Sequence, residues 1–82
     1  MAEPGVRVRF FAAAAEAAGR RDETIAGVTT AGELRRELER RHGAAMERVL
    51  ANGSLLIDGV VSRDDARELG ATADVLPPFA GG

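Results

Sequence analysis

The stretch VRVRFF at residues 6–11 sets the fold class of this 82-residue chain. Apolar and charged residues alternate along it with a period of two, which is the pattern of a β-strand that buries one face. Val6, Val8 and Phe10 should therefore point into a core. Phe11 then falls on the opposite face beside two arginines, where a large aromatic side chain is unexpected unless something covers it.

The segments after VRVRFF alternate between helical and extended patterns. The alanine-rich residues 12–18, closed by Gly19, predict one or two helical turns. Residues 20–22 are typical of a turn, and residues 23–28 contain enough β-branched side chains for a second strand.

The clearest helix signal begins at Thr30. Thr30 and Glu33 fit a capping box, in which the hydroxyl and the carboxylate satisfy free amide groups of the first turn reciprocally. Ala31, Leu34 and Leu38 recur at steps of three and four residues, so one narrow stripe of the helix should meet the core.

Weaker signals complete the helical part of the chain. Gly43 suits the left-handed position after a helix end. A second helical piece over residues 45–50 is expected to bury Met46, Val49 and Leu50.

The last third of the chain predicts a hairpin and a final strand. Asp58-Gly59 separates the apolar run 55–57 from Val60-Val61, a strong signal for a two-residue hairpin turn. Residues 62–68 are polar and predict a connector with a helical turn, and residues 73–76 predict the last strand. The expected order is strand, turn, strand, helix, hairpin, strand.

The composition is that of a small folded protein. Apolar residues make up 45% of the chain and charged residues 29%, which is typical of globular domains. No apolar run approaches the roughly 20 residues that a membrane helix requires, and the first residues lack a secretory-signal pattern. We therefore expect a cytoplasmic protein with no membrane contact, forming one domain over residues 1–82.

The composition also removes several kinds of site. Cysteine is absent, which excludes disulfides, thiolate metal sites and a cysteine nucleophile. With His42 as the one histidine and no calcium-loop spacing, we expect no metal site. A net charge of −2 and three aromatic residues, all Phe, argue against nucleic acid as a partner. Lysine is absent too, so the chain offers no side-chain amine for an isopeptide bond.

No set of residues predicts catalysis by the chain itself. Asp64-Asp65 is better interpreted as a solvated turn than as a catalytic pair, and His42 at a helix end predicts a structural role. Arg35-Arg36 and Arg40-Arg41 could form a basic strip, but interleaved glutamates favour an ordinary solvated helix face. No serine has a base and an oxyanion motif around it, and no glycine-rich loop matches a phosphate site.

The C-terminal residues 77–82 (PPFAGG) carry the strongest functional signal. Two prolines stiffen the segment that leaves the last apolar run, and two glycines finish it without side chains. Fully extended, this segment could reach about 20 Å beyond Leu76. We expect a flexible tail that enters a narrow slot of a partner and presents the carboxylate of Gly82 as the reacting group. The residues expected to direct, anchor and insert the tail are Pro77, Pro78, Phe79, Ala80 and Gly81.

Four segments together resemble the MoaD/ThiS sulfur-carrier family, which has the ubiquitin-like β-grasp fold. They are VRVRFF at 6–11, LRRELERR at 34–41, LLIDGVVS at 55–62 and VLPPFAGG at 75–82. The resemblance implies an α+β domain with a mixed sheet of four to five strands packed on one main helix. The two prolines before the tail are most similar to those of the MoaD branch, the small subunits of molybdopterin synthase.

The resemblance implies a chemistry for the tail. The carboxylate of Gly82 would be adenylated with ATP by a MoeB/ThiF-like enzyme of the ubiquitin-activating type and converted to a thiocarboxylate by a sulfur donor. The tail would then enter a MoaE-like large subunit, expected as a heterotetramer, and give its sulfur to cyclic pyranopterin monophosphate. The chain would be a non-catalytic subunit without a bound cofactor.

The resemblance also accounts for the misplaced aromatic residue. In the family, an apolar patch docks both the activating enzyme and the large subunit. The matching positions are Phe11, the first apolar residue after the hairpin turn, Val60, and the residue before the two prolines, Leu76.

Three other interpretations remain open. The chain could carry sulfur for thiamine, cysteine or another thiolated metabolite. It could be a ubiquitin-like modifier attached to lysines of other proteins, or a binding module whose tail is disordered. The identity of a copurifying large subunit would separate the first of these from molybdopterin synthesis.

Overall fold

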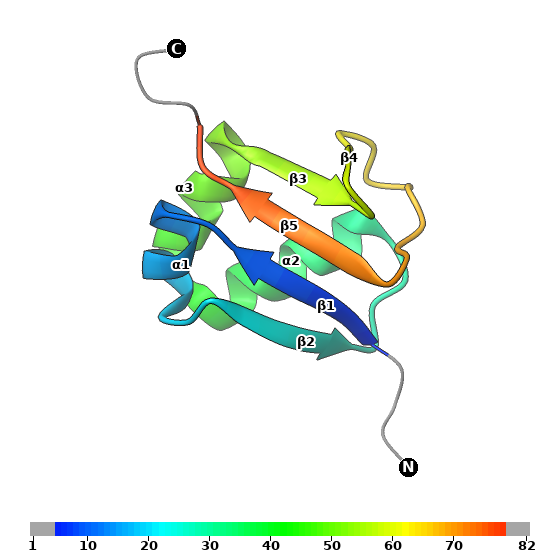
Figure 1. Cartoon of the computed structure of the whole chain (residues 1–82), viewed down its shortest axis with the longest axis horizontal. Coiled ribbons are helices and arrows are strands. Elements are labelled where there is room, and N and C mark those ends of the chain that lie inside the picture. Colours follow the sequence, from blue (N-terminus) through cyan, green and yellow to red (C-terminus); the bar gives the residue numbers. More distant parts are fainter. Residues whose placement is uncertain (1–4, 79–82) are drawn as a thin grey trace.

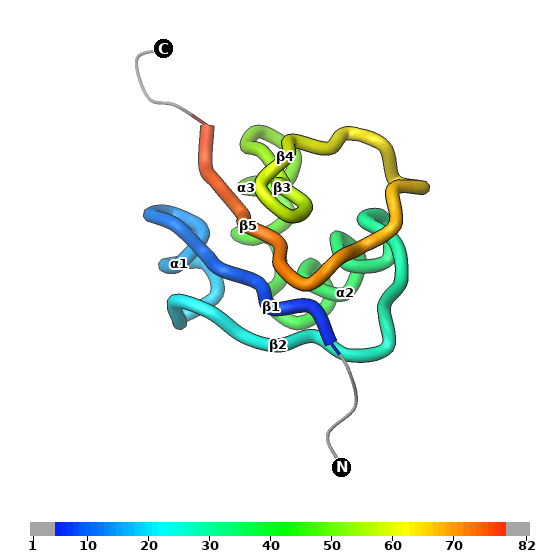
Figure 2. The backbone as a smooth tube through the Cα atoms, turned by 45° about the vertical axis from the view of Figure 1, so that its right-hand side comes forward, coloured from blue at the N-terminus to red at the C-terminus, as the bar shows by residue number. Residues whose placement is uncertain are grey.

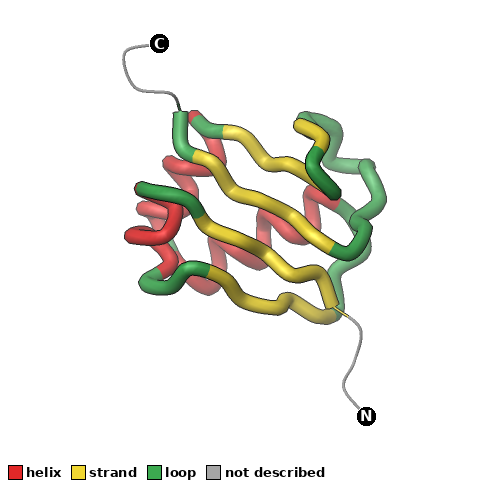
Figure 3. Tube along the Cα trace, viewed as in Figure 1, coloured by secondary structure: helices red, strands yellow, loops and turns green. Residues whose placement is uncertain are grey.

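The computed structural model describes residues 5–78 and shows one mixed sheet with helices on one of its faces (Figures 1 and 3). The elements in chain order are β1 (Gly5–Phe10), α1 (Ala13–Ala18), β2 (Asp22–Ala26), α2 (Ala31–His42), α3 (Ala44–Asn52), β3 (Ser54–Ile57), β4 (Val60–Val61) and β5 (Thr72–Leu76). This arrangement confirms the predicted α+β fold with one main helix, and its sheet has five strands where four to five were expected.

The first and last strands meet in the middle of the sheet. The strand order is β2-β1-β5-β3-β4, with β1 and β5 parallel and the other neighbours antiparallel. Figure 2 shows β5 entering between β1 and β3, which lie far apart in the sequence. In the parallel ladder Val8 pairs with Ala73 and Phe10 with Val75. The end of β5 is therefore held on both sides.

The alternation in VRVRFF predicts β1 correctly. Val6, Val8 and Phe10 are buried, and the residues between them are exposed. The second strand differs from its prediction of residues 23–28. β2 starts at Asp22 and ends at Ala26, because Gly27 has a φ of +82° and turns the chain away from the ladder.

Helix α2 begins at the predicted cap, with one change in its hydrogen bonds. The amide of Glu33 donates to the Thr30 hydroxyl at 3.3 Å, as the capping box requires. The Glu33 carboxylate, however, accepts from the amide of Thr29 at 2.7 Å and from its hydroxyl at 3.0 Å, one residue earlier than predicted. These hydrogen bonds lower the pKa of Glu33.

Gly43 ends α2 and begins α3 at once. Its φ of +77° has the predicted sign, but its ψ of −157° places it outside the left-handed helical region. This combination is essentially restricted to glycine. It redirects the backbone so that α3 starts at Ala44 instead of leaving into a loop.

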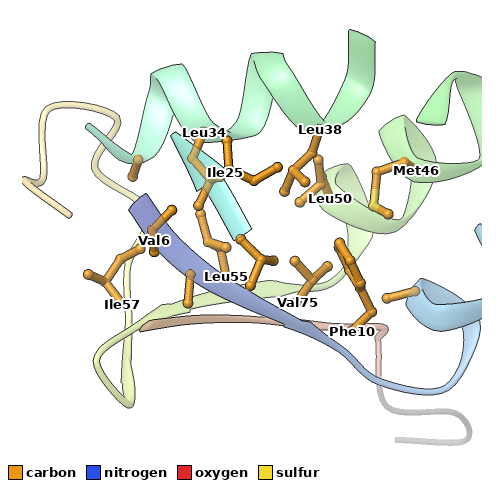
Figure 4. Packing of buried hydrophobic residues seen from close by; sticks show 14 residues of the cluster. Val6, Phe10, Ile25, Leu34, Leu38, Met46, Leu50, Leu55, Ile57 and Val75 are labelled. Carbon is orange, nitrogen blue, oxygen red and sulfur yellow. The ribbon is translucent and has the colours of Figure 1, made fainter. Parts of the chain in front are cut away.

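The core lies between the sheet and the helices. Buried side chains from β1, β3 and β5 point toward α2 and α3, as Figure 4 shows for Phe10, Leu55 and Val75. Leu38 and Met46 meet them from the helices. The set also includes Leu34 and Leu50, in agreement with the predicted stripes. Val49 was expected among the buried residues and is only partly buried at the edge of this cluster.

The hairpin forms at the predicted turn and is tied to β5. Asp58 and Gly59 have φ values of +48° and +84°, which is the signature of a type I′ turn. The Asp58 amide donates to the Thr72 carbonyl at 2.9 Å, and the Asp58 carboxylate accepts from the Thr72 amide at 3.0 Å. The predicted helical turn in residues 62–68 is absent there. That segment makes one reverse turn, with the Arg67 amide donating to the Asp64 carbonyl.

Gly53, at the junction of α3 and β3, should not accept a larger residue without a loss of stability. A Cβ atom there would overlap the carbonyl oxygen of Leu76 and lie 2.8 Å from that of Val49. Because both neighbours are backbone, we expect Gly53→Ala to reduce the free energy of unfolding by about 1 to 3 kcal/mol, measured by urea unfolding.

The control for Gly53 is Ala51→Ser at an exposed position of α3, which should change stability by less than about 0.5 kcal/mol. Equal unfolding midpoints for the two variants would contradict the close approach of Gly53 to β5.

Candidate functional site

The base of the predicted tail is fixed by two neighbouring strands. Phe11 donates its amide to the carbonyl of Val75 at 3.1 Å on one side. Ser54 pairs with Leu76 on the other side. Pro77 is half-buried and Pro78 is exposed as the chain leaves this position. These contacts fix the direction in which the chain runs from Leu76 to Pro78.

The remaining tail residues of the prediction lie outside the described part of the chain. They are Phe79, Ala80, Gly81 and Gly82.

Phe11 and Leu76 come together on the face of the sheet that carries no helix. The parallel pairing of Phe10 with Val75 makes Phe11 and Leu76 neighbours at the ends of their strands. Since Phe10 and Val75 point into the core, the side chains that follow them lie on the opposite face. Phe11 is 41% exposed, and the guanidinium of Arg9 lies over its ring, 5.9 Å from the centroid.

The third predicted docking residue lies on the other side of β4 from these two. Val60 pairs with buried Ile57, whereas Val61 pairs with Leu56. Directly opposed residues share a face of the sheet, so the register places Val61, not Val60, on the outer face. Both valines are more than half exposed, at 57% and 53%. Leu56 lies between Val61 and β5 on this face and is half-buried.

An ion pair that the sequence analysis missed lies at the centre of the outer face. Arg9 donates through Nε and Nη2 to the two carboxylate oxygens of Asp74, at 2.7 and 2.9 Å. The side chain of Asp74 is only 11% exposed and that of Arg9 is 52% exposed. The hydrogen bond to Asp74 raises the pKa of Arg9. The sequence does place a charged residue in each of the predicted first and last strands, Arg9 and Asp74. Their contact follows only once those two strands are known to pair.

We define the outer face as Phe11, Arg9, Asp74, Leu56, Val61 and Leu76. It combines exposed apolar side chains with one fixed charge pair, in which Asp74 has its acceptors occupied. Such a face suits association with another protein. It contains no general base aimed at a nucleophile, and nothing in its geometry suggests chemistry on the face itself.

A second polar cluster connects β2 to the end of α2. Glu23 is buried on the inner side of β2, and its Oε1 lies 2.5 Å from Nε2 of His42. Arg41 and Arg20 approach its other oxygen at 3.5 and 3.4 Å. The ring of His42 also meets Phe10 edge-on, with centroids 5.8 Å apart. His42 therefore has the structural role that its position predicted.

Two of the four arginines of α2, Arg40 and Arg41, are engaged by a glutamate of their own helix. Glu37 accepts from Arg41 at 2.7 Å and from Arg40 at 3.1 and 2.5 Å. These hydrogen bonds, from Arg40 first and then Arg41, lower the pKa of Glu37 to about 2. Arg40 and Arg41 thus belong to a solvated charged face, the interpretation favoured from the sequence, and not to a free basic strip.

Residues 5–78 lack two further features, a metal-binding cluster and a membrane-spanning helix. No group of three or more histidine, aspartate or glutamate side chains in that range is arranged to hold a metal ion. None of the helices described has both the length and the apolar character needed to cross a bilayer.

Comparisons with known proteins agree with this geometry. The sequence model of the ThiS family matches residues 8–82. A candidate molybdopterin converting factor, subunit 1, from Pyrococcus furiosus is 25% identical, with a TM-score of 0.76 over 90% of this chain and 97% of its own. SAMP1 from Haloferax volcanii is 24% identical, with a TM-score of 0.78 over 95% and 99%, and supports the fold alone. No curated protein sequence matches this chain.

Removal of Arg9 should destabilise the fold, because it leaves the carboxylate of Asp74 without its ion-pair partner. Arg9→Met should lower the urea midpoint, because a nearly buried carboxylate loses both donors. The double variant Arg9→Met with Asp74→Val should recover part of the loss, since it removes both polar groups together.

Arg7→Met is the matched control for Arg9. Arg7 lies two residues before Arg9 in β1, so its side chain is on the same face of the sheet, and it contacts the exposed Asp22 at 3.4 Å. A midpoint for Arg9→Met equal to that of Arg7→Met would show that the ion pair adds nothing to the fold.

Proposed function

Because this chain belongs to the ThiS family of small sulfur carriers, we propose that the terminal carboxylate of Gly82 is the group that carries its sulfur. Family members are non-catalytic and hold sulfur as a C-terminal thiocarboxylate. The observation that carries the proposal for this chain is the end of β5. The end of β5 is paired with β1 and β3 on its two sides, and Pro77-Pro78 leave it next to the exposed outer face.

The proposed chemistry has two steps, adenylation of the carboxylate and its conversion to a thiocarboxylate. The family implies an activating partner of the ThiF/MoeB type for them. A terminal carboxyl group has an ordinary pKa of about 3.3 to 3.7, so at neutral pH it is an ionised, poor electrophile. One carboxylate oxygen attacks the α-phosphorus of ATP and pyrophosphate leaves. A sulfur nucleophile at the oxidation level of sulfide then attacks the carbonyl carbon of the acyl adenylate. AMP leaves, and a thiocarboxylate remains.

The chain contributes delivery and restraint to this reaction. Pro77 and Pro78 fix two φ angles, which reduces the conformational freedom that the segment loses on entering a partner. Gly81 and Gly82 give the narrowest possible backbone at the reacting end. The sequence has no cysteine to accept sulfur elsewhere. It also has no lysine, so an activated terminus cannot acylate a lysine of another copy.

For the recipient of the sulfur we propose molybdopterin synthesis, with a MoaE-like large subunit that accepts the tail in a heterotetramer. The PPFAGG ending and the likeness to the Pyrococcus furiosus protein support this choice. Within the same chemistry, a carrier for thiamine, cysteine or another thiolated metabolite differs only in its large partner. A ubiquitin-like modifier would differ in product, because the activated carbonyl would end in an amide bond to a target protein.

For the partner surface we propose the outer face next to the tail. Phe11 and Leu76 lie together at the base of the tail, and Val61 shares their face through its pairing with Leu56. Docking of the activating enzyme on this face would bring the tail to its adenylation site. Val60, on the other side of β4, then has no direct part in docking.

The carboxylate mechanism is tested by intact-protein mass spectrometry after incubation with a ThiF/MoeB-type enzyme, ATP and a sulfide source. The wild-type chain should gain the mass difference between sulfur and oxygen on its C-terminal fragment. Deletion of Gly82, or addition of one residue after it, should abolish the gain and leave the circular dichroism spectrum unchanged. Sulfur incorporation by either altered chain would refute the terminal mechanism, and persistent adducts with other proteins would instead support a modifier.

The outer face is tested by the rate of ATP-dependent adenylation at limiting carrier concentration. Phe11→Ser and Val61→Ser should each lower kcat/KM by roughly tenfold, as expected for truncation of a docking side chain worth more than about 1 kcal/mol. Val60→Ser is the matched control, with the same chemical change on the opposite side of β4, and should retain the rate. Equal losses for Val60→Ser and Val61→Ser would rule out docking through the outer face.

A further inference from the structure

The junction of α3 and β3 contains the one carboxamide side chain of the sequence. Asn52 ends α3 and is exposed, and Gly53 follows it directly. Figure 1 shows this junction beside the end of β5. In an asparagine-glycine pair the backbone nitrogen of the glycine can attack the asparagine side chain readily, because glycine has no side chain to obstruct the approach. The pair is therefore chemically prone to deamidation.

The packing of the junction leaves no alternative to glycine after Asn52. A Cβ atom on residue 53 would overlap the carbonyl oxygen of Leu76 and lie 2.8 Å from that of Val49. A bulkier residue, which would slow the attack on Asn52, does not fit there. The fold therefore retains the reactive pair next to the base of the tail.

Two hydrogen bonds hold the reacting groups apart in the closed junction. The amide of Gly53 donates to the carbonyl of Val49 at 2.7 Å. The side-chain nitrogen Nδ2 of Asn52 donates to the carbonyl of Arg48 at 3.0 Å, so the carboxamide is turned back along α3. Reaction requires the Gly53 nitrogen to lose its proton and to lie against Cγ of Asn52, and both hydrogen bonds oppose this. Deamidation is therefore restricted to the moments when the junction opens.

The end of β5 resists this opening. The amide of Asp58 donates to the carbonyl of Thr72, and hydrogen-bonded pairs alternate with other pairs along an antiparallel ladder. In the register of β3 with β5, Ser54 and Leu76 therefore form a pair that exchanges both backbone hydrogen bonds. This pair directly follows Gly53 and holds it against β5.

We propose that Asn52 is a site of spontaneous deamidation, and that the pairing of Ser54 with Leu76 controls its rate by keeping the junction closed. In the open junction hydroxide removes the proton of the Gly53 amide, and the nitrogen attacks Cγ of Asn52. The new bond between nitrogen and carbon closes a cyclic succinimide, and the carboxamide nitrogen leaves as ammonia. Water then opens either carbonyl of the ring and gives aspartate or isoaspartate. The net reaction consumes one water and releases one ammonia.

Both products disturb the base of the tail. Each replaces the donor to Arg48 by a negative charge at the C-terminal end of α3, where the helix dipole disfavours it. Isoaspartate also adds a methylene group to the main chain just before Gly53, which has no free space toward Leu76. An isoaspartyl chain should therefore lose the pairing of Ser54 with Leu76, whatever group the tail carries.

The rate is tested by intact-protein mass spectrometry of the full chain during incubation in mildly alkaline buffer. Because Asn52 is the one carboxamide of the sequence, each deamidation exchanges one NH2 for OH and is read directly from the mass. The folded chain should react roughly tenfold more slowly, or slower still, than the same chain in concentrated urea. At low urea concentrations the rate should hardly change, since a local opening exposes little surface. Asn52→Ser is the background control, and its mass should stay constant.

The role of β5 is tested with Leu76→Pro, which cannot donate to the Ser54 carbonyl. This variant should raise the rate in the absence of urea roughly fivefold or more. Ile25→Val is the control, because it trims a buried side chain in β2, on the other side of the sheet. It should leave the rate within about twofold of the wild-type chain.

The effect on the tail is tested by hydrogen exchange of the purified isoaspartyl chain. Exchange of the Leu76 amide should be faster than in the unreacted protein. The Phe10 amide, which donates to the Arg21 carbonyl at 2.8 Å, is the internal reference and should be unchanged. Asn52→Asp carries the charge without the extra methylene group, so its effect on Leu76 should be smaller.

Several outcomes would overturn the proposal. A constant mass in concentrated urea would remove the site itself, and equal rates for the folded and unfolded chain would remove its protection. A rate that rises with urea along the slope of global unfolding would contradict a local opening, as would equal acceleration by Leu76→Pro and Ile25→Val. Unchanged exchange of the Leu76 amide in the isoaspartyl chain would refute the link to the tail.

Discussion

The parallel ladder between β1 and β5 is the constraint on which the rest of the structure depends. It joins residues about as far apart as this chain allows, and the Arg9–Asp74 ion pair within it spans 65 positions of sequence. Closing so long a loop costs conformational entropy that local contacts cannot offset. The ladder therefore relies on the apolar side chains beneath it, with Val8, Phe10 and Val75 packed under α2 and α3. Both the base of the tail and the outer face exist only once this closure has formed.

The outer face shows how a carrier can expose a binding surface and keep its fold. Its apolar side chains lie at the ends and edge of the sheet, at Phe11, Leu76 and Val61, while the centre is held by Arg9 and Asp74. A nearly buried carboxylate with both oxygens bound by one guanidinium disfavours arrangements of the two strands in which the carboxylate loses that partner. Buried polar pairs of this kind contribute more to such specificity than to the free energy of unfolding. The pair lies in the same register that puts Phe11 beside Leu76.

Much of the fold could be predicted from the sequence where a local rule and the tertiary contacts agree. The alternation in VRVRFF, the stripe of α2 and the Asp58-Gly59 turn are examples. The sequence is insufficient where the deciding partner is remote. Val60-Val61 has no alternation, so only pairing with β3 shows which valine faces outward. The burial of Glu23 depends on His42 and Arg41, which come from the end of a helix. For the site, the sequence indicated the tail and two residues of its base, but not the central ion pair.

The placement of β5 has a mechanical consequence for a protein whose end is to be drawn into another molecule. Tension applied to Leu76 along the axis of β5 loads a strand that has hydrogen-bonded neighbours on both sides. The bonds of both ladders then resist sliding at the same time, as in shear, and do not open one after another as in the peeling of an edge strand. A partner can therefore pull on the terminus with considerable force before the domain begins to unravel.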